Sequence, residues 1–276
     1  MTSIALLLDE RPRPTVPYEL SWGLHPSVLL GTGLLGALYF YGIGPWRRRR
    51  GLPPAPRWKV ASFVAALLVL LGALNGPMHD LSDYYLFSVH MVQHLLLTLL
   101  LPPLLILGLP GWLLEPLLRP PAVRRAARML THPVVAAVVF TVTIAVWHVS
   151  QYYELMMRNH EVHIVTHLMF MATATLLWWP VMSPVPDILP RMGYGIGMLY
   201  LFLVGIPMQI VAALITLSDR VLYPWYSAAP RTWGLSPLDD QQLGGLVMWV
   251  PAGFAYLAAA LGIVAMWLRA PAVRFR

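Results

Sequence analysis

The stretch Met78–Leu100, which reads MHDLSDYYLFSVHMVQHLLLTLL, decides the fold. Its second half is too apolar to be anything but a membrane span, yet it carries His90 and His94, four residues apart. Residues four apart share one face of a helix. A helix that enters the membrane near Asp83 carries His94 about 15 Å down, close to the middle of a hydrocarbon layer about 30 Å thick. Ionisable side chains at that depth are costly and by default mark a site, so the stretch predicts a polar site inside a membrane bundle.

The composition of the whole chain agrees with an integral membrane protein. Of its 276 residues, 58% are hydrophobic and only 11% are charged, and the mean hydropathy is positive, a balance that a soluble domain of this size does not have. The net charge of +7 does not indicate nucleic acid, because most arginines stand in short clusters between apolar runs, where they set topology. There are no cysteines, which leaves His, Met and carboxylate side chains as metal ligands.

The apolar runs predict an all-α, polytopic membrane protein. Residues 1–24 are expected to form a retained extracytoplasmic leader, because they lack the basic start and the apolar core of a signal peptide. Residues 25–276 are expected to form one transmembrane domain of seven helices. The predicted spans cover roughly residues 25–46, 60–78, 84–107, 133–150, 162–182, 193–217 and 242–268. An arginine-rich segment after Gly108 is expected to lie on the membrane surface.

Basic residues predict the orientation of these spans. They concentrate after the first span (Arg47, Arg48, Arg49, Arg50, Arg57, Lys59), after the third (Arg119, Arg124, Arg125, Arg128) and in the tail (Arg269, Arg274, Arg276). The positive-inside rule places those segments in the cytoplasm. The N-terminus is therefore predicted outside and the C-terminus in the cytoplasm.

The histidines gather on the predicted outer side. Of the nine, all but His132 fall at the outer ends of spans or in the outer half of the membrane. The HMVQH of His90–His94 resembles the HIVTH of His163–His167, and each is preceded by a histidine and two tyrosines. This pattern indicates a weak tandem repeat of spans two and three against four and five. Such a repeat brings four imidazoles together at similar depth.

Imidazoles in pairs four residues apart indicate a transition-metal site. Neutral imidazoles bind copper, zinc, iron or nickel, and two on facing helices also ligate a haem iron. The candidate ligands are His79, His90, His94, His148, His160, His163 and His167, with Met78 and Met91 as candidate thioether ligands of monovalent copper. Asp83, Glu161 and Asp240 are candidates to orient the rings through their other nitrogen. The ordinary alternatives are a hydrogen-bonded histidine, a methionine that packs, and an Asp240 that caps the last helix.

Several ordered motifs carry a resemblance to a known family. They are HMVQHLLL at His90 with PPLLILG beyond it, Trp147-His148 followed by Tyr153, HIVTH followed by Phe170 and WWPV at Trp178, and DQQLGGLVMW at Asp240. Together they resemble the seven-span CtaG family of bacterial cytochrome c oxidase (caa-type) assembly factors. The chain departs from the pattern at Ser150, where a proline is expected after the Trp-His pair. The resemblance implies a protein of the bacterial cytoplasmic membrane that helps to mature a copper-containing haem oxidase.

The leading hypothesis joins the histidine cluster to this resemblance. It is a protein, not an enzyme, that receives copper on the outer side, from a periplasmic or extracellular donor, and helps to load it into an oxidase subunit. Three alternatives remain open at this stage: a haem-binding protein, a zinc or di-metal membrane hydrolase with Asp240 or Glu161 as general base, and a scaffold whose histidines are structural. No HExxH motif supports the hydrolase.

Overall fold

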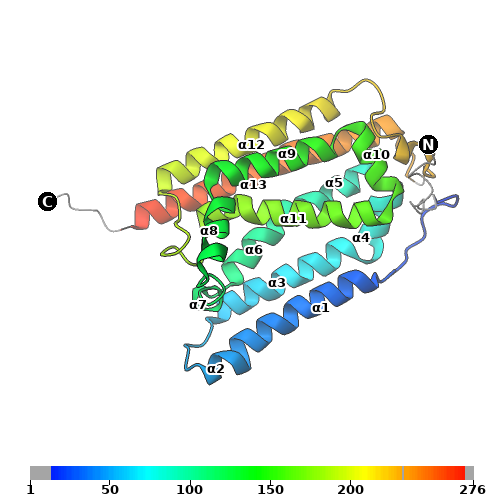
Figure 1. Cartoon of the computed structure of the whole chain (residues 1–276). Coiled ribbons are helices and arrows are strands. Elements are labelled where there is room, and N and C mark those ends of the chain that lie inside the picture. The colour runs from blue at the N-terminus through cyan, green and yellow to red at the C-terminus, as the bar shows by residue number, and fades with distance from the viewer. Residues whose placement is uncertain (1–13, 232, 271–276) are drawn as a thin grey trace, which may run out of the picture.

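The computed structural model describes residues 14–231 and 233–270. Within these residues the chain folds as helices joined by short loops, as the sequence predicts (Figure 1). The first half of the expected leader, residues 1–13, and the tail arginines Arg274 and Arg276 lie outside the described residues. The long helices run side by side in one bundle. The helices are α1 (Pro26–Tyr41), α2 (Arg47–Arg49), α3 (Arg57–Leu74), α4 (Gly76–Asp80), α5 (Phe87–Leu95), α6 (Leu101–Gly108), α7 (Gly111–Leu114), α8 (Pro121–Leu130), α9 (Pro133–Trp147), α10 (Ser150–Arg158), α11 (His160–Met182), α12 (Tyr194–Thr216) and α13 (Pro237–Arg269).

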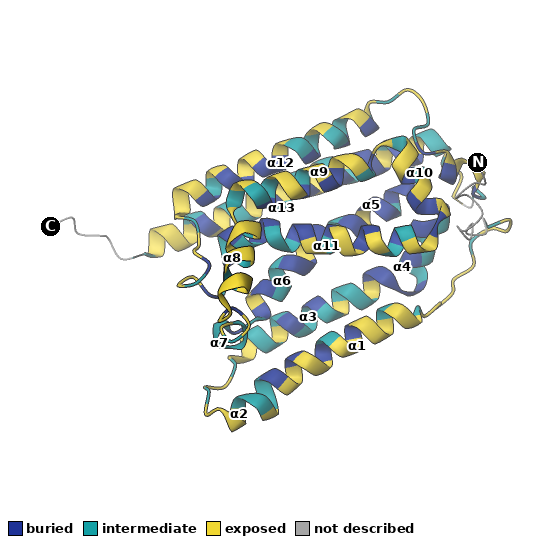
Figure 2. Cartoon of the chain, in the orientation of Figure 1, coloured by how far each residue is buried: buried dark blue, intermediate teal, exposed yellow. Residues whose placement is uncertain are grey.

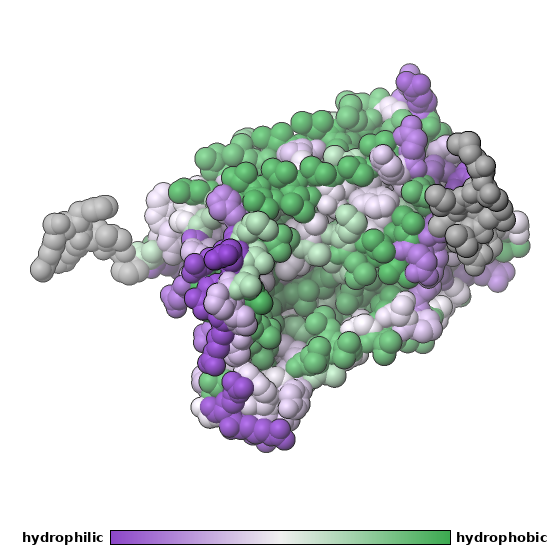
Figure 3. Space-filling view, viewed as in Figure 1, coloured by the Kyte–Doolittle hydropathy of each residue, from purple (hydrophilic) through white to green (hydrophobic). Residues whose placement is uncertain are grey.

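Six helical segments of the described chain are long and apolar enough to cross a membrane, and a seventh is obtained if α8 and α9 count as one broken span. The six are Pro26–Arg49, Arg57–Leu74, Phe87–Gly108, His160–Met182, Tyr194–Thr216 and Pro237–Arg269. They match six of the predicted spans to within a few residues. Hydrophobic side chains cover the sides of the bundle and hydrophilic ones gather at its ends (Figure 3).

The predicted fourth span is shorter than expected. Helix α9 ends at Trp147 rather than near residue 150, because Val149 is extended and a separate helix, α10, begins at Ser150. Before it, the segment that the sequence placed on the membrane surface forms α8, whose residues are all at least partly exposed and whose axis is bent by 63° from α9. In Figure 1, α8 lies with α2 and α7 at one end of the bundle, opposite α4 and α10.

The second span also ends earlier than predicted. Helix α3 stops at Leu74, Asn75 is extended, and α4 starts at Gly76, whose φ is +61°. A positive φ strains any side chain, so glycine is needed here. A Cβ on Gly76 would also lie 2.9 Å from the Trp22 ring. After the break, His79 lies in the short helix α4 and Asp83 lies in the π turn that follows it, Leu81–Tyr85. These two elements cover the end of the bundle at which α5 begins.

A second π turn, Leu96–Leu100, joins α5 to α6 in the third span. Proline has no N–H, so Pro102 leaves the carbonyl of Thr98 without its usual helical donor. The Trp178 indole Nε1 of α11 donates to that carbonyl at 3.0 Å. The kinked third span is thereby joined to α11 within the bundle.

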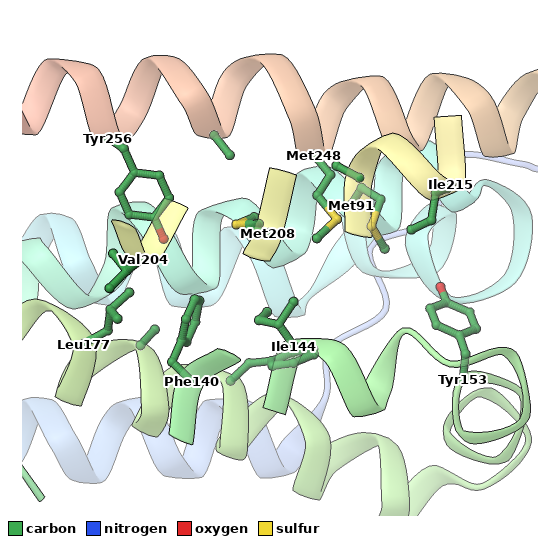
Figure 4. Close-up of a cluster of buried hydrophobic side chains, with 14 of the residues drawn as sticks. Met91, Phe140, Ile144, Tyr153, Leu177, Val204, Met208, Ile215, Met248 and Tyr256 are labelled. Carbon is green, nitrogen blue, oxygen red and sulfur yellow. The ribbon is translucent and has the colours of Figure 1, made fainter. Parts of the chain in front are cut away.

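The main hydrophobic core lies between α5, α9, α11, α12 and α13. Figure 4 shows Met91, Phe140, Met208, Met248 and Tyr256 directed into it from different helices. Figure 2 shows the same division along each helix, with buried residues on the faces turned inward and exposed ones outward. Helices α12 and α13 pack closely at Gly245, where an added Cβ would lie 2.7 Å from the backbone nitrogen of Thr216.

We expect Gly245→Ala to destabilise the bundle, because the new methyl group must displace backbone. Overpacking of this kind costs about 1–3 kcal/mol. The matched control is Gly262→Ala on the same helix, where a Cβ would meet nothing within 4 Å and where alanine favours helix by up to about 1 kcal/mol. Thermal unfolding in detergent should show a lower midpoint for the first variant and an unchanged or higher one for the second. Equal midpoints would contradict the close packing of α12 on α13.

Candidate metal centre

Helices α5 and α11 present their histidines in the same way. His90 and His94 are the fourth and eighth residues of α5, and His163 and His167 are the fourth and eighth of α11. Side chains four apart share one helix face. All four are buried, so the two HxVxH faces are directed into the protein rather than toward lipid.

The rings of the two helices converge on one cluster. Within each helix the ring centroids lie 4.2 Å apart (His90 and His94) and 4.3 Å apart (His163 and His167). Between helices, the His90 centroid lies 5.6 Å from that of His163 and 6.0 Å from that of His167. The His94 and His167 centroids are 5.6 Å apart. His148, at the end of α9, closes the deeper side with its centroid 6.0 Å from that of His94.

Two trios of this cluster have the spacing of a metal site. The potential ligand atoms of His90, His94 and His167 all lie within 4.8 Å of one another, and so do those of Asp83, His90 and His163. We call them the inner trio and the outer trio. Every member is buried.

Several ring nitrogens of the cluster have no hydrogen-bond partner in the protein. The Nδ1 atoms of His90 and His148 lie 3.2 Å and 2.7 Å from the carbonyls of Ser82 and Ile144. A carbonyl only accepts, so each Nδ1 carries the proton and each Nε2 carries the lone pair. Among the described residues nothing bonds those two Nε2 atoms, the Nε2 of His167, or either nitrogen of His94. Buried polar atoms are nearly always satisfied, so these nitrogens indicate a missing ligand.

Asp83, one of the carboxylates predicted to orient a ring, lies against two rings in the outer part of the cluster. Its Oδ2 lies 3.3 Å from Nε2 of His79 and 3.3 Å from Nδ1 of His163. With the His163 proton on Nδ1, its Nε2 is the atom that can ligate a metal, the arrangement in which a carboxylate commonly supports a ligating histidine.

Gln93, which sequence reasoning missed, fixes His79. Its amide Nε2 donates to the carbonyl of Ala73 at 2.7 Å, which sets the orientation of the amide, and it lies 3.2 Å from Nδ1 of His79. His79 therefore accepts at Nδ1 and donates from Nε2 to Asp83. Both of its ring nitrogens are engaged within the protein. The sequence signal was a buried polar residue three positions after His90 in the same span.

The turn that carries Asp83 is held by the loop between α12 and α13. Trp225 Nε1 donates to the carbonyl of Asp83 at 2.8 Å, and the Tyr226 hydroxyl donates to the carbonyl of Ser82 at 2.7 Å. The Tyr153 hydroxyl of α10 lies 3.0 Å from that of Tyr226. These aromatic residues, like Gln93, were not among the predicted site residues.

Asp240 contacts the helix of the cluster instead of a ring. Its Oδ2 accepts from the Phe87 backbone N–H at 2.8 Å, and its Oδ1 accepts from the N–H and hydroxyl of Ser88 at 3.1 Å and 2.6 Å. A carboxylate there satisfies the free N–H groups of a helix N-terminus and favours its dipole. Asp240 thus caps α5, while α13, its own helix, is capped by Ser236.

The remaining predicted site residues lie at the rim or outside the cluster. His160 and Glu161 are exposed in the first turn of α11. Met78 is half-buried in α4, and Met91 is buried in the hydrophobic core (Figure 4). His25, which was not among the predicted site residues, packs its ring against His79 with the centroids 4.2 Å apart.

Residues 14–24 run over this end of the bundle. The Gly76 N–H donates to the carbonyl of Gly23 at 2.9 Å, and the Ser21 hydroxyl donates to the Asp80 carboxylate. The Tyr85 hydroxyl donates to the carbonyl of Val16 at 3.3 Å. Burial, with the nearby Asp80 charge, raises the pKa of Tyr85, so it remains a neutral donor. The described part of the leader therefore covers the α4 side of the cluster.

A cavity of about 610 Å³ reaches the cluster from the side of the bundle. Leucine and other apolar residues of α1, α3, α6 and α11 line most of it, and His25, His79, His160, His163 and His167 line its polar end. Figure 3 views this face, where hydrophobic side chains surround the hollow between α11 and α1. The cavity connects exposed His160 with buried His163 and His167.

Fold and site define a class: a multi-span helical membrane protein with a buried histidine and aspartate cluster that can hold a metal ion. The chain belongs to the cytochrome c oxidase caa3 assembly factor (Caa3_CtaG) family, whose model matches residues 37–270. This confirms the resemblance drawn from the motifs.

Relatives with similar sequences occur in mycobacteria. Uncharacterized proteins of Mycobacterium bovis and Mycobacterium tuberculosis are each 27% identical over 278 residues, which cover 93% of this chain and 41% of theirs. One from Mycobacterium leprae is 24% identical over 233 residues, which cover 77% of this chain and 35% of its own. The chain spans less than half the length of these curated relatives. No solved structure matches it.

We expect Asp240→Asn to loosen the start of α5. The asparagine keeps one acceptor oxygen but turns an NH₂ group toward the N–H groups of Phe87 and Ser88, and loss of such a cap costs about 1–2 kcal/mol. Amide hydrogen exchange at Phe87 and Ser88 should accelerate. Asp239→Asn is the matched control, because Asp239 is exposed in the same turn. Equal exchange in both variants would refute the capping role.

Proposed function

We propose that this chain holds copper in its histidine cluster and helps to load it into a caa3-type cytochrome c oxidase. The observation that carries the proposal is the set of buried imidazole nitrogens on His90, His94, His148 and His167 that have no partner among the described residues. These nitrogens lie close to His163, and together they form a set of imidazole ligands without thiolates. The chain is also a member of an oxidase assembly family. The client oxidase contains copper, which is why copper is preferred over other metals that bind imidazole.

Each histidine has a distinct part in this proposal. His90, His94, His163 and His167 are the ligands, and His148 is an additional ligand from the deeper side. His79 acts through Asp83, which orients His163, because both nitrogens of His79 have partners within the protein. His160 and His25, at the polar end of the cavity, receive the ion from an external copper donor.

The structure of the cluster argues against two alternative functions, haem binding and metal-dependent hydrolysis. Ring centroids 4.2–6.0 Å apart, with Phe170 4.7 Å from His94, fill the space among the helices that a porphyrin would need. A hydrolase needs a general base beside the metal. Asp240 is engaged at the N-terminus of α5 and Glu161 is exposed, which argues against both carboxylates in that role.

The proposed function requires that the histidine cluster lie on one particular side of the membrane. We propose that the chain lies in the bacterial cytoplasmic membrane with its N-terminus outside and its C-terminus in the cytoplasm, which places the cluster in the outer half. The tandem-repeat hypothesis fits the element order, since α3, α4, α5 and α9, α10, α11 each read as long helix, short helix, histidine helix. His79 and His148 differ in position, one in the short helix and one at the end of the long helix.

The absence of cysteine makes the orientation directly testable. We expect Arg49→Cys, in the first arginine cluster, to react with a membrane-impermeant maleimide only after cells are opened. Asp219→Cys, in the exposed loop after α12, should react in intact cells. The positive-inside rule is the physical reason for the difference. The reverse labelling pattern would invert the topology and place the cluster on the cytoplasmic side.

The central test is metal analysis with an optical spectrum on detergent-purified protein. We expect wild-type protein to retain near-stoichiometric copper and the variant His90→Asn with His167→Asn to lose most of it, because His90 belongs to both trios and neither trio is then complete. His132→Asn, an exposed residue at the start of α9, is the control and should retain copper.

Other outcomes would redirect the proposal. A Soret band would identify haem as the cargo, and zinc alone would favour the hydrolase. Metal-free wild-type protein that still supports oxidase maturation, with a double variant equally active, would show that the histidines are structural.

A further inference from the structure

The two trios of the cluster share one residue, His90. The inner trio takes His90 with His94 and His167, and the outer trio takes it with Asp83 and His163. A neutral imidazole has one lone pair, and it therefore binds one metal ion at a time. In His90 the carbonyl of Ser82 holds the proton on Nδ1 and leaves the lone pair on Nε2. The two trios cannot both be complete at once.

The trios lie at different depths along the same two helices. His94 follows His90 by one helical turn, and His167 follows His163 by one turn. Four residues of α-helix rise about 6 Å. The outer trio is therefore nearer the α4 end of the bundle and the inner trio is deeper, with His90 between them.

The ligands of the trios also differ in charge and hardness. The outer trio includes the Asp83 carboxylate, an oxygen ligand that suits divalent ions, whereas the inner trio offers three neutral imidazoles, which suit copper in either oxidation state. Asp83 also accepts from His79 and His163. Its position as a ligand is thus shared with protein donors, and binding there can be exchanged readily.

We propose that the cluster is a one-ion relay with two alternative positions, in which His90 remains bound while Asp83 and His163 are exchanged for His94 and His167. This inference rests on the proposed metal-binding function. It adds the number of ions bound at one time and the order in which the ion passes from the outer trio to the inner trio. The ion enters at the outer trio and moves about one helical turn deeper. Only metal–ligand bonds are exchanged, so no electron is transferred.

The first test counts copper(II) ions bound per chain in purified protein. We expect saturation at about one ion in wild type, and also at about one in His163→Asn and in His167→Asn, because each variant keeps one trio intact around the single His90 lone pair. His90→Asn should fall well below one. Two independent sites would give two ions in wild type and one in each single variant, which would overturn the relay. A bridging, doubly deprotonated His90 would also give two ions, with spin-coupled copper, and would overturn it equally.

The second test distinguishes the two positions by pulsed electron paramagnetic resonance of bound copper(II). We expect nitrogen couplings from the inner trio in His163→Asn, and a ligand set that includes oxygen in His167→Asn. Adding Asp83→Asn should alter the spectrum in the His167→Asn background and leave it unchanged in the His163→Asn background. Identical spectra in both backgrounds would refute two positions.

These tests separate failure of the relay from failure of the proposed function. Wild-type protein that binds no copper would refute both, whereas wild type that binds two ions would refute only the relay. His132→Asn controls for nonspecific loss, and size-exclusion profiles identify variants that do not fold. If His90→Asn does not fold, the wild-type count, compared with the counts for the two α11 variants, still decides between one ion and two.

Discussion

The structure depends on one constraint: polar groups within a lipid-facing bundle must find their partners inside the protein. Water is absent from the hydrocarbon layer, so each unmet donor or acceptor there costs free energy. The bundle meets this demand at most points through hydrogen bonds between its helices, such as Trp178 on the Thr98 carbonyl and Asp240 on the start of α5. At the histidine cluster it does not, since neither nitrogen of His94 has a hydrogen-bond partner among the residues that the structure describes. Buried polar groups almost always have a hydrogen-bond partner. An imidazole that has none is best explained by a ligand that binds to its nitrogen.

The support around the cluster comes from distant parts of the chain. Asp240 on α13 holds the first turn of α5, and Trp225 and Tyr226 hold the turn of Ser82 and Asp83. The start of α5 and the turn that carries Asp83 are thus held by residues that follow them by more than a hundred positions. Precise placement of ligands in this way is what a metal site requires of its surroundings.

Hydropathy and spacing were enough to predict the spans and the convergence of His90, His94, His163 and His167. These features are local, because a twenty-residue apolar run and an i, i+4 pair each have only one plausible arrangement in a membrane. The roles of Asp240, Gln93 and His79 were not predictable in the same way, since each depends on a partner from another helix. The early end of α3 was also missed: the predicted span was extended to Met78, although Gly76 and Pro77 are ordinary breakers.

The π turn at Leu96–Leu100 sets the rotation of the histidine face relative to the rest of the third span. A π turn contains one residue more than an α turn, and one residue corresponds to about 100° of rotation about a helix axis. The upper half of the span can therefore direct His90 and His94 toward α11 while the lower half directs Leu101 and Ile106 into the apolar core. The inserted residue rotates one half of the span relative to the other. A polar face in the upper half and an apolar face in the lower half can therefore both be directed into the protein within a single membrane span.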